Sequence, residues 1–198
     1  MKPSAAAVLA VALLLLAAPA ARAQPVSARS GPDTYLEFDL GTFIPQSGDL
    51  SQFDPRVAVF GTFGAMFSPA LGAEASIGYY RASATTRGTP PDPDTTQTLG
   101  IVPVMVNLRL VAPLKAVELS ARAGVGIQFA TLYSSGGTSS YNKATAFGWQ
   151  VGASAAFNLS PTMLVGVDVL GSFAEGKFDG VAVGLDGIVF AVKLGYRL

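Results

Sequence analysis

The 198-residue sequence contains no cysteine and no histidine. Without cysteine there can be no disulfide, no thiolate metal site and no lipid-modified N-terminal cysteine. Without histidine the chain lacks the side chain that most often acts as a general base near neutral pH. Charged residues make up only 13% of the chain, against about 25% in ordinary soluble domains. These absences point away from disulfide-stapled folds, histidine-dependent hydrolases and typical soluble proteins.

The N-terminus has the three parts of a signal peptide. Lys2 gives a basic start, residues 5–18 contain no polar side chain, and Ala21-Arg22-Ala23 forms a small-residue cleavage site. We expect cleavage after Ala23, so that 1–23 is the signal peptide, 24–34 a periplasmic lead-in and 35–198 the folded domain. An uncleaved N-terminal anchor is the alternative, although the apolar segment is short for a spanning helix.

Long apolar runs are missing beyond the signal peptide, although half of all residues are hydrophobic. Helical membrane spans, which need about 20 such residues in a row, are therefore not expected. Apolar residues alternate with polar ones instead, most clearly over 117–129, where every odd position is apolar. A period of two predicts a β-strand with one apolar face. Thirteen residues exceed the ~5–6 of a typical strand and suffice to cross a bilayer, which takes ~9–11.

The same alternation recurs in eight segments, at 35–43, 56–67, 71–81, 99–111, 117–129, 144–159, 163–173 and 187–198. They are joined alternately by short turns that contain proline and by longer polar loops at 44–55, 82–97, 132–143 and 175–186. An open sheet edge in lipid would leave backbone groups unpaired. We therefore predict an all-β fold, an eight-stranded antiparallel transmembrane up-and-down β-barrel, with the short turns in the periplasm and the long loops outside.

Pro103 lies inside the fourth segment. Because proline has no backbone N–H to donate, we expect a bulge or a local loss of strand pairing at this position.

A barrel of eight strands has an interior just wide enough for side chains to fill. The inward-facing positions collect nine charged residues of nearly balanced sign, namely Glu37, Asp39, Glu74, Arg109, Glu118, Arg122, Asp168, Lys193 and Arg197. We expect a polar network in the lumen, because a buried unpaired charge costs far more than a paired one. This network could hold the strands in register, or it could gate a polar path for a small solute. The sequence leaves both alternatives open.

The pattern resembles the small outer-membrane β-barrel domain proteins of Gram-negative bacteria, of the OmpA-barrel, OmpX and OmpW type. The resemblance rests on the signal peptide, the eight alternating segments, the turn at Ser68-Pro69 and the closing segment 193–198. It implies a location in the cell outer membrane. It also implies that the final strand, through Tyr196 and Leu198, is an assembly signal for the barrel-insertion machinery, although such strands usually end in an aromatic residue.

We therefore expect a non-enzymatic outer-membrane barrel with a structural, surface-contact or limited small-solute passage role. No cofactor or metal is expected, and the expected partners are outer-membrane lipid and lipopolysaccharide around a monomer. Once the signal peptide is removed, 11 basic residues face 13 acidic ones, and without a basic stripe nucleic acid is not an expected partner.

Two alternatives stay open. A barrel enzyme acting on lipid would resemble hydrolases that activate serine or water with histidine, which this chain lacks. A secreted soluble ligand-binding barrel would need a charged outer face, whereas here the outward parity would be apolar over many strands, which is an aggregation hazard in water.

Overall fold

The structure is a computed structural model that describes residues 33–50, 52–88, 94–114, 117–135 and 139–198. The expected signal peptide at 1–23 and nearly all of the lead-in at 24–34 lie outside the described residues. Among the described residues, no helix combines the length and the apolar character needed to cross a membrane. The described residues fold into strands and one 3-10 turn, η1 (Gly48–Leu50). The strands are β1 (Asp33–Pro45), β2 (Asp54–Met66), β3 (Leu71–Thr86), β4 (Thr95–Leu114), β5 (Val117–Ser135), β6 (Ser140–Asn158), β7 (Met163–Phe178), β8 (Val181–Gly184) and β9 (Gly187–Arg197).

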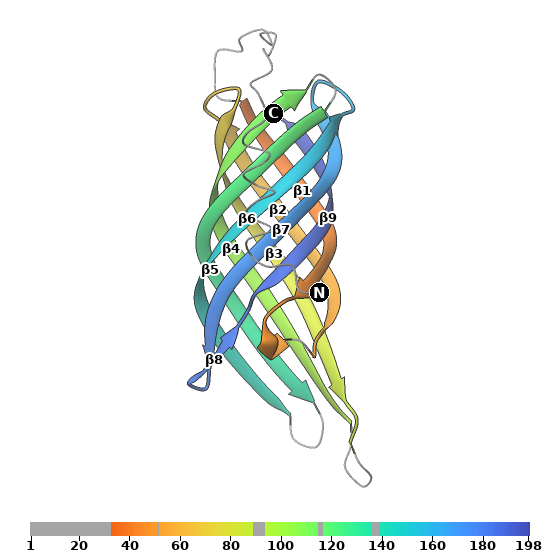
Figure 1. Cartoon of the computed structure of the whole chain (residues 1–198), viewed down its shortest axis with the longest axis vertical. Helices are drawn as coiled ribbons and strands as arrows, with labels where there is room; N and C mark the ends of the chain where they lie inside the picture. Colours follow the sequence, from red (N-terminus) through yellow and green to blue (C-terminus); the bar gives the residue numbers. More distant parts are fainter. Residues whose placement is uncertain (1–32, 51, 89–93, 115–116, 136–138) are drawn as a thin grey trace.

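Eight of these strands close into a barrel (Figure 1). Strands β1 to β7 pair antiparallel in sequence order, β9 pairs with β7, and β9 also pairs with β1 to complete the ring. The remaining strand, β8, forms a short hairpin with the end of β7. The chain is therefore an eight-stranded antiparallel up-and-down barrel, which confirms the fold predicted from the alternation.

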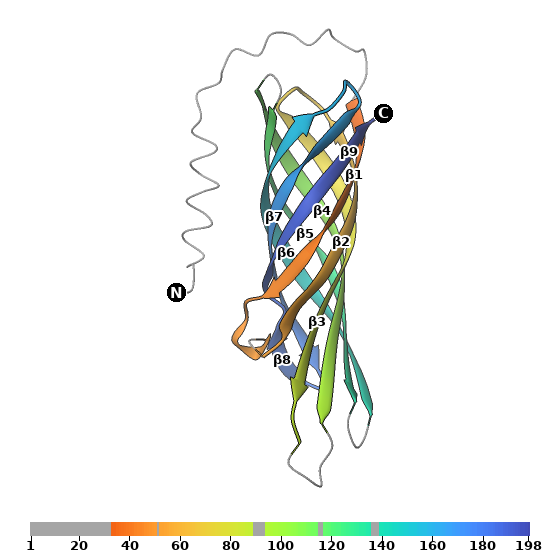
Figure 2. The same ribbon diagram turned by 90° about the vertical axis from the view of Figure 1, so that its right-hand side faces the viewer.

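The barrel has two unlike ends. At one end, the turn end, serine hydroxyls organise tight turns: Ser68 Oγ accepts the N–H of Leu71, and Ser160 Oγ accepts the N–H of Met163. Such side-chain hydrogen bonds are a common way for serine to stabilise a turn. The chain ends at the same place, where the N–H of Leu198 donates to the carbonyl oxygen of Thr34. The opposite end, the loop end, carries longer hairpins that project beyond the ring (Figure 2).

All four predicted long loops are partly strand, so the predicted boundaries at 44–55, 82–97, 132–143 and 175–186 were wrong; at 44–55 only the two residues at each end belong to β1 and β2. The β3–β4 ladder continues to Thr86↔Thr95, the β5–β6 ladder to Ser134↔Ser140, and β7 and β8 pair over 175–184. The lead-in was also drawn two residues too long, because β1 begins at Asp33. In the extension of the β3–β4 ladder the outward positions are polar, whereas the inward residues Ala82 and Ala84 stay buried. The apolar alternation then stops, although threonine still favours the extended conformation.

Pro103 interrupts one of its two ladders. Toward β5 it pairs with Gln128 in a continuous register. Toward β3 the pairing stops at Ile77↔Val104 and resumes at Tyr80↔Ile101, with the same register on both sides. This is the local loss of pairing that the proline predicts, and since the register does not shift, no bulge accompanies it.

The parity of the strands separates a lipid-like outer face from a buried inner face. In β5 the side chains of Val125, Ile127 and Phe129 are about half exposed, whereas Gln128 and Ala130 are fully buried. The exposed large hydrophobic side chains of the other ring strands follow the same alternation. The outer wall therefore suits hydrocarbon, and the functional question moves to the lumen and to the loop end.

Candidate functional site: the barrel lumen

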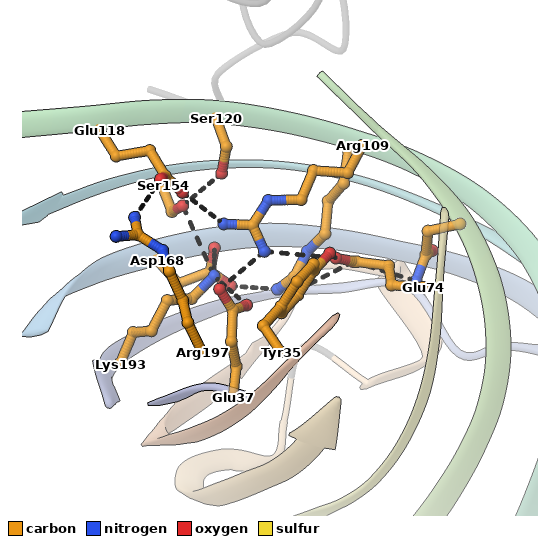
Figure 3. Close-up of polar contacts among 12 residues, drawn as sticks. Tyr35, Glu37, Glu74, Arg109, Glu118, Ser120, Ser154, Asp168, Lys193 and Arg197 are labelled. Atoms are coloured by element: carbon orange, nitrogen blue, oxygen red, sulfur yellow. Dashed lines mark hydrogen bonds and ion pairs between the residues drawn. The ribbon is translucent and has the colours of Figure 1, made fainter. Parts of the chain in front are cut away.

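The inward-facing charged side chains gather in the half of the lumen nearer the turn end, since they lie early in β1, β3 and β5 and late in β4 and β9. Their side chains point toward one another across the lumen (Figure 3). Six of them form a closed ring in which every cation lies between two carboxylates, in the order Arg109, Glu37, Lys193, Asp168, Arg122 and Glu74. The shorter contacts are 2.6 Å between Arg109 Nη1 and Glu37 Oε1, and 2.8 Å between Lys193 Nζ and Glu37 Oε2. No side chain of this ionic ring is more than 6% exposed.

The ionic ring fixes how the strands align. Its members come from β1, β3, β4, β5, β7 and β9, which are six of the eight strands of the barrel. A slip of one residue in any strand turns its inward side chains outward. Such a slip would carry one charge into lipid and leave its partners buried and unpaired. The ring therefore favours one register over its neighbours, which is a clearer role for buried ion pairs than net stabilisation.

A branch of the network runs from the ionic ring toward the turn end. Glu118 accepts from Arg109 Nη2 at 3.0 Å and from Arg197 Nη2 at 2.8 Å. Arg197 also donates to Asn158 Oδ1 at 2.9 Å. The Arg197 side chain is 32% exposed, so the branch ends in contact with solvent while the ring does not.

Neutral side chains complete the coordination of the ionic ring. Tyr35 donates its hydroxyl to Glu74 Oε2 at 3.0 Å, and the Arg109 guanidinium lies 4.7 Å from the centre of the Tyr35 ring. Gly64 leaves the space that this ring fills, since a Cβ there would overlap it. Asn107 donates to Glu74 and accepts from Gln150 Nε2 at 2.6 Å.

Asp39 lies beside the network rather than in it. The residue is fully buried, neither carboxylate oxygen accepts a hydrogen bond, and no described cation lies within ion-pair distance. Its cross-strand neighbours are Phe60 and Lys193. The structure thus joins eight of the nine charged residues singled out from the sequence and leaves Asp39 out. The lumen holds five acids and only four cations. The nearest cation along the ladder, Lys193, directs its ammonium to Glu37 and Asp168 and not to Asp39.

The half of the lumen nearer the loop end is mainly apolar. Phe43 and Tyr80 stack with their ring centres 4.9 Å apart, and Phe60 lies 5.1 Å from Tyr80. All three are at most 4% exposed. We call this group, with its buried neighbours Leu99, Ile101, Leu170, Leu185 and Val189, the aromatic plug. The aromatic plug was not predicted from the sequence, because charge was the signal used to select inward residues. Phe43, Phe60 and Tyr80 each lie on the inward parity of their own strand.

The first and last loops cover the aromatic plug. Leu50 and Phe53 of the first loop are buried against it. Ser47 Oγ donates to the carbonyl oxygen of Gly184 at 2.7 Å, and the N–H of Gln46 donates to the carbonyl oxygen of Asp186 at 2.9 Å. Partial burial raises the pKa of the Asp186 carboxyl, and a hydrogen bond from the N–H of Ala174 opposes that shift. The two loops are thus held together over the lumen.

Tyr196 and Leu198, the residues expected to mark the chain for assembly, lie on the outer wall. Their side chains are about half exposed. Tyr196 is paired with Leu36 on one side and Met163 on the other, so the last strand is fully built into the barrel.

Comparison with known proteins agrees with this architecture. Residues 8–197 match the family described as outer membrane protein beta-barrel domain. None of the curated proteins matches the chain. Among solved structures, the chain is similar to Neisserial surface protein A (NspA), with 12% identity, a TM-score of 0.58, and coverage of 85% of this chain and 100% of that one.

Two further structures share the fold at similarly low identity. OprG of Pseudomonas aeruginosa is 13% identical with a TM-score of 0.56, over 88% of this chain and 99% of that one. The outer membrane protease OmpT of Escherichia coli is 8% identical with a TM-score of 0.50, over 84% and 97%. At these identities the likeness concerns the fold alone. The family match covers nearly the whole chain, and the chain therefore belongs to the outer membrane protein beta-barrel domain family and is a protein of the cell outer membrane.

Proposed function

We propose that this protein is a closed, non-enzymatic barrel with a structural or surface-contact role in the outer membrane. One observation carries the proposal: side chains fill the lumen in two successive layers, the ionic ring toward the turn end and the aromatic plug toward the loop end. Lys193 in the first layer and Tyr80 in the second are each at most 1% exposed.

The two layers argue against a path that opens when one ion pair breaks. Loss of the Glu118 contacts would free Arg197 at the solvent-exposed branch, while the ionic ring would stay closed through Glu37 and Glu74. The aromatic plug would also stay in place, because its packing is apolar and involves no member of the ring. Passage of a polar solute would require both layers to rearrange together.

The serine hydroxyls of the lumen support a non-catalytic role. Ser120 Oγ and Ser154 Oγ lie 2.7 Å apart and hydrogen-bond to each other. Lys193 Nζ is 3.5 Å from Ser154 Oγ, and a lysine can serve as the base for a serine nucleophile. Here, however, the ammonium contacts Glu37 at 2.8 Å and Asp168 at 3.8 Å, so it is directed to two carboxylates and not to the serine pair.

The partners we propose are those of a monomer embedded in lipid. The exposed outer wall suits lipid acyl chains, and the loop end suits the lipopolysaccharide leaflet if the short turns face the periplasm, as they do in bacterial barrels. Tyr196 and Leu198 would be recognised by the barrel-insertion machinery before the last strand pairs with β1.

Planar-bilayer recording tests the closed lumen. The purified, refolded protein should give no discrete conductance steps, and Glu118→Gln should be equally silent, because neither the ionic ring nor the aromatic plug depends on that carboxylate. Heat-modifiable mobility on gels would show that both proteins are folded. Discrete steps in the unchanged protein that Glu118→Gln alters would contradict the proposal and favour a gated polar path.

A further inference from the structure

An unusual row of residues crosses the outer wall near the loop end. Arg81 of β3 pairs with Gly100 of β4, Gly100 pairs with Thr131 of β5, and Thr131 pairs with Lys143 of β6. All four belong to the outward parity of their strands, and the Arg81 and Lys143 side chains are exposed. We call these four residues the cationic row. Two cations thus stand at the ends of one row, separated by a glycine and a threonine.

The cationic row marks the place where the outer wall changes from apolar to polar. One rung toward the turn end, the outward residues include Val102, Phe129 and, on β3, Tyr79. One rung toward the loop end they are Ser83, Thr98, Tyr133 and Tyr141, paired in that order. In β5 the apolar outward positions run from Val117 to Phe129, about the length needed to cross the hydrocarbon, and Thr131 is the next outward residue. The row therefore lies at the boundary between acyl chains and headgroups.

Hydroxyl groups and aromatic rings lie along the cationic row between and beside the two cations. A Cβ at Gly100 would lie 3.1 Å from Thr131 Oγ1 and 3.5 Å from the Tyr79 hydroxyl oxygen. A side chain at this position would therefore cover polar atoms that the glycine leaves accessible between Arg81 and Lys143. Lys143 Nζ lies 5.3 Å from the centre of the Tyr141 ring, which holds the ammonium over the wall. Beyond Arg81, Arg56 Nε donates to Ser83 Oγ at 3.0 Å and brings a third cation to the edge of the row.

The two cations of the cationic row have no acidic partner among the described residues, although Asp54 of β2 is paired with Ser83 beside the row. Among the described residues, neither Arg81 nor Lys143 lies within 4 Å of a carboxylate. The described outward positions of β3, β4, β5 and β6 from the cationic row to the hairpin ends carry no acid, being occupied by Arg81, Ser83, Thr85, Thr96, Thr98, Gly100, Thr131, Tyr133, Ser135, Tyr141 and Lys143. Asp94 lies at the tip of the β3–β4 hairpin, where it accepts the N–H of Gly88.

We propose that the cationic row binds the phosphorylated headgroup of outer-leaflet lipopolysaccharide, with Arg81 and Lys143 as its two charge contacts and the Tyr79 hydroxyl as a hydrogen-bond donor beside Gly100. The Thr131 hydroxyl already donates to the carbonyl oxygen of Gly100 at 3.4 Å. Guanidinium and ammonium groups are the usual ligands of phosphate in proteins. Three strand spacings of ~4.8 Å put the cations roughly 14 Å apart, and strand tilt sets them at different depths. That geometry fits one large headgroup bearing several phosphates better than a single small anion.

The inference rests on the proposed orientation, with the hairpins outside, and not on the closed lumen. A barrel that conducts ions could still bind lipopolysaccharide at the cationic row, and a barrel that gives no conductance could lack this binding. The bilayer recording and the test below therefore fail independently.

The test compares heat-modifiable unfolding temperatures of the full refolded chain in phospholipid vesicles that contain increasing mole fractions of lipopolysaccharide. We expect the unfolding temperature to rise with lipopolysaccharide. The double variant Arg81→Ala/Lys143→Ala should need on the order of 30-fold more for the same rise, since each cation near an anionic lipid surface contributes roughly a fivefold gain in affinity. The charge-keeping variant Arg81→Lys/Lys143→Arg should respond like the unchanged protein.

Three controls make the outcome decisive. Lys177→Ala removes an exposed outward cation of β7, outside the cationic row, and should leave the response unchanged. Enzymatically dephosphorylated lipopolysaccharide should give little rise, and inorganic phosphate at the same phosphorus concentration should give none. The proposal is overturned if the double variant responds like the unchanged protein, if Lys177→Ala loses as much, or if dephosphorylated lipid or free phosphate works equally well.

Discussion

Replacing Arg109 by methionine should lower the free energy of unfolding by about 3–5 kcal/mol, the usual cost of removing one partner from a buried ion-pair network. Arg109 contacts Glu37, Glu74 and Glu118, and its side chain is only 4% exposed. Methionine keeps much of the volume, so the loss comes from three carboxylates left with fewer partners. The fluorescence of Trp149, the single tryptophan of the chain, can follow urea unfolding in phospholipid vesicles.

Arg197→Met is the matched control for this change. Arg197 carries the same charge and also contacts Glu118, but it is 32% exposed at the end of the branch. Exposed pairs contribute about 0–1 kcal/mol, and Glu118 keeps Arg109 as a partner. Equal losses from the two variants would mean that the ionic ring is no more important than a surface pair.

Replacing Val125 by arginine should cost about 2–4 kcal/mol, because the new charge would face hydrocarbon near the middle of the bilayer. Val125 is 51% exposed on the outer wall, paired with Val106 and Trp149. Since Trp149 is a direct neighbour, its fluorescence would change for local reasons. The folded fraction is better measured by heat-modifiable mobility across a urea series in phospholipid vesicles.

Thr145→Arg is the matched control, because it introduces the same residue at a different depth in the membrane. Thr145 belongs to the same outer face and pairs with Phe129, one rung from the cationic row. Arginine near the interface costs only about 0–1 kcal/mol. If arginine were tolerated equally at both positions, the outer wall between them could not lie in lipid as described.

The alternation predicts much of this fold because every residue that faces lipid must be apolar. Each spanning strand, including the stretch from Val117 to Phe129, must present an apolar side chain at every second position. Strand number, order and facing could therefore be predicted from the sequence. The strand ends could not, since the ladders that continue to Thr95 and Ser134 leave the membrane and lose the constraint.

The lumen was predictable as a set of residues but not as a set of contacts. Parity places Glu37, Arg109 and Asp39 inside the barrel alike. Whether a carboxylate meets a guanidinium across the lumen depends on strand tilt, on the stagger between strands and on side-chain rotamers, none of which the alternation encodes. The contact between Arg109 and Glu37 and the isolation of Asp39 therefore required the structure.

Thiol labelling tests the closed lumen most directly, because the chain has no cysteine of its own. Ser172 lies in the lumen, is fully buried, and accepts a hydrogen bond from Gln128 Nε2 at 2.9 Å. In vesicles, a Ser172→Cys variant should resist a small charged thiol reagent while folded and react fully in urea, whereas Thr86→Cys at the exposed loop end should react at once. Rapid labelling of folded Ser172→Cys would show that solvent reaches the middle of the barrel and would contradict a lumen closed by the ionic ring and the aromatic plug.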